Sequence, residues 1–210
     1  MEKYFGKYER FDTLSKKDAG QLLTSDNLIG DVYDIEVDLD DGIHKAWMVS
    51  RFGKRVGFFS PAFSRKLSVM KAQGMTCKAI LAFVAFSDSP DPGIYWGHAA
   101  VICFNPAYAY EFDTFIGNIA DKIGEGLLPK IDLGGDKVEQ IIASNGEWIP
   151  DQREKYPAKK NGTAIVKRRR SMTDKLVEQG RAGNKGCYFA SWAVLLAFVA
   201  VIVFCVVRCS

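Results

Sequence analysis

The sequence contains little of the chemistry on which most enzymes depend. Histidine occurs only at positions 44 and 98, and no glycine-rich loop leads into Lys-Ser or Lys-Thr. No serine lies in a Gly-x-Ser-x-Gly elbow, and no His/Cys cluster has the spacing of a zinc site. His98 and Cys103 are five residues apart, so a regular strand turns them to opposite faces and separates a Cys–His pair. We therefore predict a non-enzymatic protein with no cofactor and no metal site.

Cysteine is scarce as well, and its spacing argues against a disulfide scaffold. Cys77 and Cys103 fall in apolar, strand-like runs, where we expect inert core thiols. Cys187, Cys205 and Cys209 lie within or beside an apolar run near the end of the sequence. The odd number of cysteines and their wide separation are consistent with a reducing cytoplasm around the folded part of the chain.

Charge is absent from residues 188–207, YFASWAVLLAFVAVIVFCVV, which also lack proline and glycine. A helix of twenty residues is about 30 Å long, the thickness of the hydrocarbon core of a bilayer. A buried helix of a water-soluble domain would carry a polar stripe, and Ser191 is the only clear candidate for one. We therefore predict a transmembrane helix over residues 187–207. Positions that represent the span are Tyr188, Trp192, Leu195, Phe198, Ile202 and Val207.

The flanks of this run predict the orientation of the protein. Residues 151–186 hold eleven Lys and Arg against four Asp and Glu, whereas only residues 208–210 follow the run. This excess of positive charge predicts a single-pass, tail-anchored protein whose N-terminal part lies in the cytoplasm. The basic residues also suit anionic lipid headgroups, where each Lys or Arg contributes about 1 kcal/mol. The residues concerned are Lys167, Arg168, Arg169, Arg170, Lys175, Arg181 and Lys185.

Small residues on the predicted membrane helix allow two interpretations. Ala193, Ala197 and Ala200 share one face, which is typical of a helix that packs against a second copy. Alternatively, these alanines face lipid. The predicted partners are therefore the membrane, a protein that the sequence does not identify and, through the alanine face, a second copy of the chain.

Residues 1–150 show the patterning of one α+β domain. Between residues 31 and 59, alternating apolar and polar residues with a tight-turn signal at Asp41-Gly42 predict three antiparallel strands. Residues 77–86 and 94–104 are long apolar runs that we expect to pair as a hairpin. The sequence therefore predicts mainly an antiparallel sheet or a small barrel of the SH3 or OB type.

Helices are expected to pack on this sheet. Ser60-Pro61 provides the cap and the first-turn proline of one helix, and Asn105-Pro106 begins a longer one. Asp136 caps the last helix of the domain. Residues 151–186 are polar and basic, so we predict a linker there, with a short helix that the capping box Ser171–Asp174 opens.

Residues 51–74, RFGKRVGFFSPAFSRKLSVMKAQG, resemble the centre of a HIRAN domain. The resemblance rests on the Gly57-Phe58 pair in a strand, the Ser60-Pro61 helix entry and a closing glycine, and with the strand order it extends over about residues 30–104. It implies a small SH3- or OB-like β-barrel and the binding of DNA, particularly free single-strand ends. The loop rich in Asn, Pro, Tyr and Asp that precedes the second strand of the family is replaced here by residues 40–45, DDGIHK.

Three functions are compatible with the sequence. The first is a single-pass membrane protein that displays a non-enzymatic binding domain, residues 1–150, on a basic linker. The second, which the HIRAN resemblance implies, is a nucleic-acid-binding domain tethered to the membrane. The third is a metal-dependent hydrolase that would use the carboxylates between Asp34 and Asp41. Their spacing is that of a solvated strand face, and they lack the glycine and the terminal Glu of a calcium loop.

Overall fold

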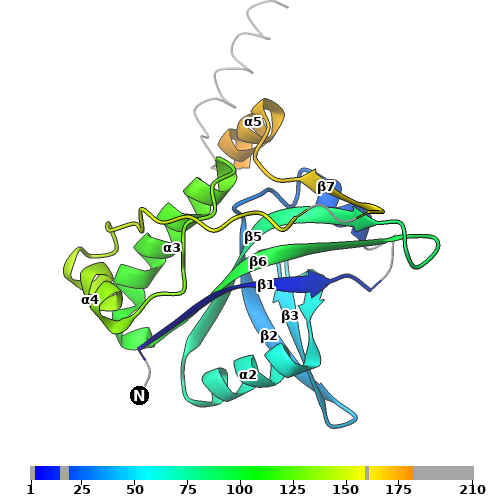
Figure 1. Ribbon diagram of the computed structural model, residues 1–210. Helices are drawn as coiled ribbons and strands as arrows, with labels where there is room; N and C mark the ends of the chain where they lie inside the picture. The colour runs from blue at the N-terminus through cyan, green and yellow to red at the C-terminus, as the bar shows by residue number, and fades with distance from the viewer. Residues whose placement is uncertain (1–2, 15–18, 159–160, 182–210) are drawn as a thin grey trace, which may run out of the picture. The chain divides into compact units, whose positions relative to one another are not determined.

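The computed structural model describes residues 3–14, 19–158 and 161–181, and the chain divides into two compact units, residues 1–170 and 171–210. The first unit is built on one antiparallel sheet of seven strands in the order β2-β3-β4-β1-β6-β5-β7. A further pairing of β2 with β5 closes six of these strands into a barrel (Figure 1). The strands are β1 (Tyr4–Asp12), β2 (Val32–Asp40), β3 (Ile43–Val49), β4 (Arg55–Phe59), β5 (Thr76–Ser87), β6 (Ile94–Phe104) and β7 (Thr163–Lys167).

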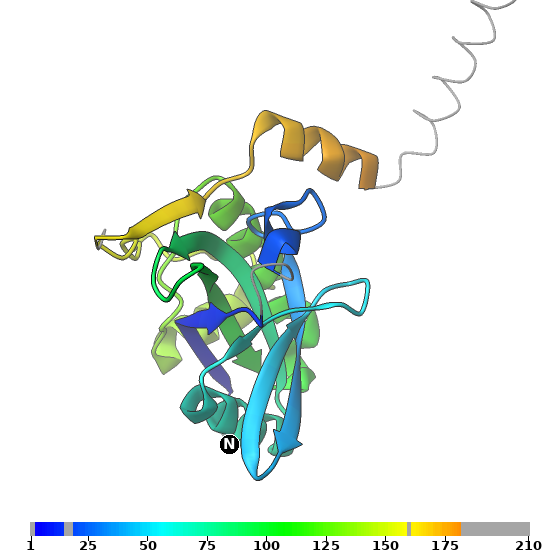
Figure 2. The ribbon, with the colours of Figure 1, turned by 90° about the vertical axis from the view of Figure 1, so that its right-hand side faces the viewer.

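The predicted fold class, α+β with a small antiparallel barrel and packed helices, is confirmed. β2 and β3 form a long hairpin (Figure 2), joined by Asp41 and Gly42. The φ angles of these two residues are 47° and 77°, as a tight hairpin turn requires. β5 and β6 pair along their whole length, from Thr76 opposite Phe104 to Ser87 opposite Ile94. Both hairpins agree with the predicted strands.

Side chains fill the interior of the barrel. Phe11, Ile35, Met48, Phe59 and Val101 come from five different strands, and each is at most 2% exposed. Burying a side chain of this size stabilises the fold by about 1.5–3 kcal/mol. Because the interior is filled, a ligand has to bind on the outside of the barrel or at its ends.

Helix α2 (Pro61–Ala72) lies across one end of the barrel (Figure 1). It begins where the sequence predicts, since the Ser60 hydroxyl accepts a hydrogen bond from the Phe63 N–H at 3.4 Å and a proline follows the cap. Phe63, Leu67 and Met70 are buried in the same core as the barrel side chains. This helix therefore completes the hydrophobic core.

Helices α3 (Ala109–Gly124) and α4 (Gly135–Ala143) pack against each other, and α3 also contacts β5 and β6. Aromatic rings join α3 to the sheet: Phe112 stacks on Tyr4 at 5.5 Å and on Phe104 at 5.1 Å between ring centroids. Offset aromatic pairs of this kind add about 0.5–1.5 kcal/mol to the burial of their surface. Two 3-10 turns complete the first unit, η1 (Gly20–Leu23) and η2 (Pro106–Tyr108).

The structure differs from the predicted domain boundary at residue 150. The segment predicted as a linker, residues 151–186, contains β7, which pairs with β5 between Val84 and Ser87, and the first compact unit extends to Arg170. The reason is the length of β5. Its pairing with β2 covers only Lys78–Ile80, so the rest of that edge is available to another strand. Five residues inside a basic, polar segment alternate too briefly to predict this pairing.

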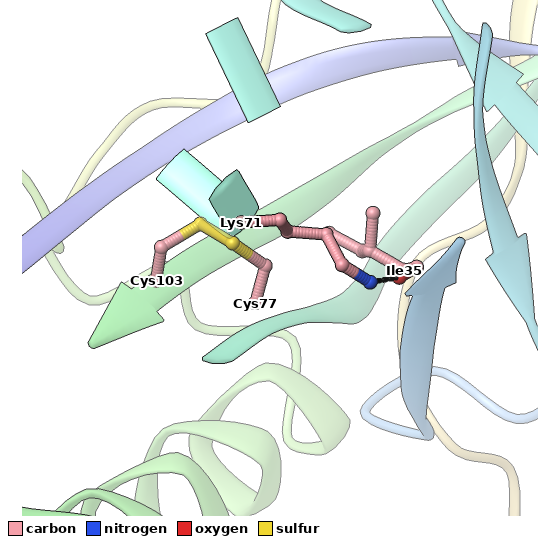
Figure 3. Close-up of a disulfide and its surroundings, with 4 residues drawn as sticks. All are labelled: Ile35, Lys71, Cys77 and Cys103. Atoms are coloured by element: carbon pink, nitrogen blue, oxygen red, sulfur yellow. Dashed lines mark hydrogen bonds between the residues drawn. A yellow bond between two sulfur atoms is a disulfide. The ribbon is translucent and has the colours of Figure 1, made fainter. Parts of the chain in front are cut away.

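Cys77 and Cys103 form a disulfide, which corrects the expectation of two inert thiols (Figure 3). They lie directly opposite each other in the β5–β6 hairpin, with Cα atoms 4.1 Å apart. The sequence predicts both strands, but the pairing of the cysteines depends on the register of the hairpin, and a shift of one residue would separate them. Nearby, Lys71 of α2 donates a hydrogen bond to the Ile35 carbonyl of β2 and ties the helix to the barrel.

The second unit contains helix α5 (Met172–Arg181). Its N-terminus has the predicted capping box. The Ser171 N–H donates to Asp174 Oδ2 at 2.9 Å, and the Asp174 N–H donates to Ser171 Oγ at 3.1 Å. These two hydrogen bonds satisfy donors that the first turn of a helix otherwise leaves free.

The predicted transmembrane helix, residues 187–207, lies outside the described residues. Within the described ranges, no helix has the length and the apolar character that crossing a membrane takes. The transmembrane helix therefore stays a prediction. The same holds for the residues that represent it and for the alanine face: Tyr188, Trp192, Leu195, Phe198, Ile202, Val207, Ala193, Ala197 and Ala200.

Candidate binding surface on the barrel

A row of four cross-strand neighbours, three of them aromatic, crosses the outer face of the barrel. Trp47 of β3 lies opposite Phe58 of β4, and Phe58 lies opposite Asp12 of β1. Asp12 in turn lies opposite Trp96 of β6. Because successive residues of a strand point to opposite faces, the neighbours of these residues fill the core and the row itself faces outward. Two aromatic clusters are built around this row. The Trp47 cluster consists of Trp47, Phe58, Lys45 and Arg55. The Trp96 cluster consists of Trp96, Arg10, Phe83, His98 and Tyr156.

The Trp47 cluster places a cation over two rings. The rings of Trp47 and Phe58 meet edge to face, with centroids 5.3 Å apart and an interplanar angle of 62°. The Lys45 ammonium lies 4.5 Å from the Trp47 centroid and 4.2 Å from the Phe58 centroid. Both distances are well inside the range of about 6 Å in which the negative face of a ring attracts a cation. The two rings therefore form a corner that holds a positive charge.

Arg55 adds a second cation to this cluster. Its guanidinium lies 5.2 Å from the Trp47 centroid and is held by β2, donating to Asp38 at 2.6 Å and to Glu36 at 3.3 Å. The hydrogen bond to Asp38 raises the pKa of Arg55, so its charge is permanent. Ion pairs this exposed contribute about 0–1 kcal/mol, so their main effect is to fix the position of the guanidinium.

Trp47 itself has an unusual environment. It is only 7% exposed, and its indole Nε1–H is the one buried side-chain donor without a hydrogen-bond partner in the part of the chain that the structure describes. Leaving such a group unpaired costs about 1–3 kcal/mol, so most proteins provide an acceptor. An acceptor is therefore missing beside the corner that holds the Lys45 ammonium.

The Trp96 cluster has similar chemistry but no unpaired group. The Arg10 guanidinium lies 4.4 Å from the Trp96 centroid, and the Trp96 indole donates to the Ser87 hydroxyl at 2.8 Å. Phe83 stacks on His98 at 4.9 Å between centroids. The Trp96 indole therefore has its acceptor within the protein, and the rings of the cluster pack against one another.

Two further interactions complete the Trp96 cluster. The ring of Tyr156 lies 5.6 Å from that of Phe83, and the Tyr156 hydroxyl donates to the carbonyls of Gly126 and Arg168. Burial lowers the pKa of His98, and the nearby charge of Glu9 offsets part of this shift. The lowered pKa favours the neutral imidazole, which packs on the Phe83 ring as part of the folded structure.

Three of the five carboxylates considered as a metal site form ion pairs. Asp34 pairs with Lys78 at 2.6 Å, and Glu36 and Asp38 share Arg55. Within residues 3–14, 19–158 and 161–181, no three His, Cys, Asp or Glu side chains are placed to hold a metal ion together. Glu36 and Asp38 therefore position the Arg55 guanidinium over Trp47.

The basic residues predicted to meet the membrane fall into two groups. The Lys167 ammonium donates to the Asn27 carbonyl at 2.8 Å, and Arg170 Nε donates to the Ile29 carbonyl at 2.7 Å, so both side chains hold β7 and its extension against the barrel. Arg168, Arg169 and Lys175 have exposed side chains. Arg181 is the last residue of α5, and Lys185 lies outside the described residues.

A separate cleft of about 360 Å³ lies beside the start of α4. Its lining includes Lys130, Lys137, Asp132, Asp151 and Trp148, and Lys137 covers the Trp148 ring at 5.3 Å. Two lysines and two aspartates balance each other in charge. The cleft therefore has no electrostatic preference by which to select a ligand.

The Trp47 cluster is only partly predictable from the sequence. The alternation of side chains along a strand predicts that Lys45 and Trp47 lie on the same face. The contribution of Phe58 depends on the register between β3 and β4, which shifts near Met48 and Val49. Sequence reasoning could therefore find half of the cluster.

Comparisons with known proteins do not assign the chain to a family. It matches no protein-family model, no curated protein and no solved structure. The proposals below therefore rest on the sequence and on the geometry of the described residues.

Proposed function

We propose that the chain is a single-pass membrane protein that displays a non-enzymatic binding domain, and that the Trp47 cluster is the binding surface of this domain. The observation that carries the proposal is the unpaired indole N–H of Trp47, whose ring meets that of Phe58 on the outside of a barrel whose interior is filled. A surface that serves only stability is expected to pair such a donor, as the Trp96 cluster does.

The proposed anchor is the uncharged run of residues 187–207, which has the length of a bilayer core. The exposed side chains of Arg168, Arg169 and Lys175 are available to an anionic leaflet, where each contributes about 1 kcal/mol. Lys167 and Arg170 bond to backbone carbonyls of the domain, so we assign them to folding rather than to lipid.

Extraction tests the anchor directly. We expect the full-length protein to stay in the membrane pellet after an alkaline carbonate wash, and a chain that ends at Gly186 to appear in the supernatant. A soluble marker protein in the same lysate controls for trapping in vesicles. Release of the full-length protein by carbonate would contradict the proposed anchor.

The proposed orientation places the domain in the cytoplasm, because positive charge is concentrated before the run. The disulfide between Cys77 and Cys103 argues for the opposite side, since disulfides persist in oxidising compartments. Protease treatment of sealed vesicles of both orientations decides between them. We expect digestion of the domain only from the cytoplasmic side. Protection from that side would reverse the orientation.

A second candidate function is the binding of single-stranded nucleic acid, which the HIRAN resemblance implies. The observation in its favour is the combination of Lys45 and Arg55 with ring faces on a small barrel, because such platforms stack bases and attract phosphates. The carboxylates of Glu36, Asp38 and Asp12 between these groups oppose it. Titration of the full-length protein with single-stranded DNA at low ionic strength tests it, and an absence of salt-sensitive binding removes it.

A further inference from the structure

We propose that the corner between Trp47 and Phe58 binds a quaternary ammonium group of the choline type, and that Lys45 occupies this site in the free protein. The inference rests on the proposed function in one respect, namely that the Trp47 cluster is a binding surface. It does not depend on the membrane anchor.

The barrel fixes the geometry of the two rings. They come from neighbouring strands at directly paired positions, so the rigid backbone of the barrel sets their separation and angle. Both ring faces are within 4.5 Å of one ammonium nitrogen. Aromatic walls that converge on one cation are the arrangement by which proteins recognise quaternary ammonium groups.

Lys45 is held differently from Arg55. Among the described residues, no carboxylate forms an ion pair with its ammonium, in contrast to Arg55, which has two such partners. Lys45 is therefore held in place by ring faces. A primary ammonium is compact and strongly hydrated, whereas a quaternary ammonium is less so and loses less on leaving water. An external quaternary ammonium can therefore compete for the same ring faces.

The indole donor of Trp47 has no partner among the described residues. A ligand that fills the corner and also carries an oxygen near its cation would supply the acceptor that Nε1 lacks. Choline and phosphocholine have this combination of a trimethylammonium group and an oxygen two carbons away. An alkali cation or tetramethylammonium would leave the donor unpaired.

Three carboxylates flank the corner on two sides. Glu36 of β2 lies opposite Trp47, Asp38 of β2 lies opposite Lys45, and Asp12 of β1 lies opposite Phe58. They pair with only two guanidinium groups, those of Arg55 and Arg10. One negative charge is therefore in excess when Lys45 leaves the corner, and it favours a cationic ligand over an anionic one.

The occupancy by Lys45 has a measurable consequence. An internal competitor lowers the apparent affinity for the ligand by the fraction of molecules in which the site is filled. Replacing Lys45 by alanine should therefore tighten choline binding about fivefold or more. Replacing it by arginine keeps a cation over the rings and should leave the affinity close to that of the natural protein.

The experiment uses the full-length protein, labelled with ¹⁵N, in micelles of a maltoside detergent that carries no ammonium group. Choline chloride is titrated against sodium chloride at equal ionic strength while the indole N–H resonances are followed. The Trp47→Phe variant assigns the Trp47 resonance. The neutral isostere 3,3-dimethylbutan-1-ol serves as the matched ligand control, because it has the shape of choline without the charge.

The expected result is a saturable shift of the Trp47 indole with choline only, tightened by Lys45→Ala and weakened at least fivefold by Phe58→Leu. Arg10→Ala, in the Trp96 cluster, should leave the titration unchanged. A Trp47 resonance that does not respond to choline even in Lys45→Ala, or that responds equally to the neutral isostere, overturns the proposal. Circular dichroism establishes that each variant is folded, and Phe58→Met, which also removes the second ring but keeps the Trp47 indole as the probe, replaces Phe58→Leu if that variant unfolds.

Nanodiscs distinguish the source of the ligand. If the ligand is a lipid headgroup, the Trp47 resonance shifts in phosphatidylcholine discs and not in phosphatidylglycerol discs. If the ligand is a free solute, only added choline or phosphocholine shifts it. If the proposed membrane anchor is wrong, carbonate releases the full-length protein, and the choline titration can still be carried out. The two proposals can therefore be refuted independently of each other.

Discussion

The Trp47 and Trp96 clusters use the same residue types on the same face of one barrel, but they differ in how far they are completed. The two tryptophans are almost equally buried, at 7% and 8% exposed. The Trp96 indole donates to Ser87, whereas the Trp47 indole has no acceptor among the described residues. The comparison shows that burial alone does not separate a structural aromatic cluster from a binding surface. The unpaired indole donor separates them, because the Trp47 N–H lacks a hydrogen-bond acceptor that a ligand can supply.

The largest expected difference concerns the rings beside the two tryptophans. Phe83 is 1% exposed and contacts Trp96, His98 and Tyr156, so Phe83→Ala should lower the free energy of unfolding by about 3–5 kcal/mol. Phe58 is only half-buried, and Phe58→Ala should cost about 1 kcal/mol. Urea denaturation of both variants in maltoside micelles measures these changes in the free energy of unfolding. Equal costs would remove the distinction between the two clusters.

A conservative change at each tryptophan sharpens the comparison. Trp96→Phe leaves the Ser87 hydroxyl without its indole donor and should cost about 1 kcal/mol. Trp47→Phe removes a buried donor that has no partner, so it should be neutral or slightly stabilising. The measurement is again the free energy of unfolding. A larger loss for Trp47→Phe than for Trp96→Phe would mean that the Trp47 indole is satisfied in solution.

A smaller effect should appear in the pH dependence of stability. Burial lowers the pKa of His98 in the folded protein, so the unfolded chain takes up a proton at a higher pH than the folded one. The contribution is therefore complete above about pH 6.5 and is lost as the pH falls through the folded-state pKa. His98→Phe keeps a ring on Phe83 and should remove this part of the slope, whereas His44→Gln should retain it. Identical slopes for the natural protein and His98→Phe would contradict the assignment.

Local signals in the sequence explain why much of the fold could be predicted. The turn at Asp41-Gly42 and the helix entry at Ser60-Pro61 are set by residues within four positions of each other, and the structure has both. β1 and β7 are different. β1 pairs with β6 about ninety residues away, and β7 pairs with β5 at a similar separation. Neither segment alternates long enough to indicate a partner that distant.

The candidate site was harder to predict for the same physical reason. Lys45 and Trp47 share a strand, but Phe58, Arg55 and Glu36 reach them across strand pairs. The disulfide between Cys77 and Cys103 likewise follows from register. Patterns along the chain predict which face a side chain occupies. They do not predict which side chain lies opposite, because register depends on turns, bulges and packing.

The most direct test of the account is one spectrum in which both indoles are observed together. Choline chloride is added to the full-length ¹⁵N-labelled protein, with sodium chloride as the reference at equal ionic strength. We predict that the Trp47 indole resonance shifts and saturates while the Trp96 resonance stays in place. Equal movement of both resonances, movement of Trp96 alone, or movement of neither would contradict the claim that the Trp47 cluster binds a cationic ligand and the Trp96 cluster does not.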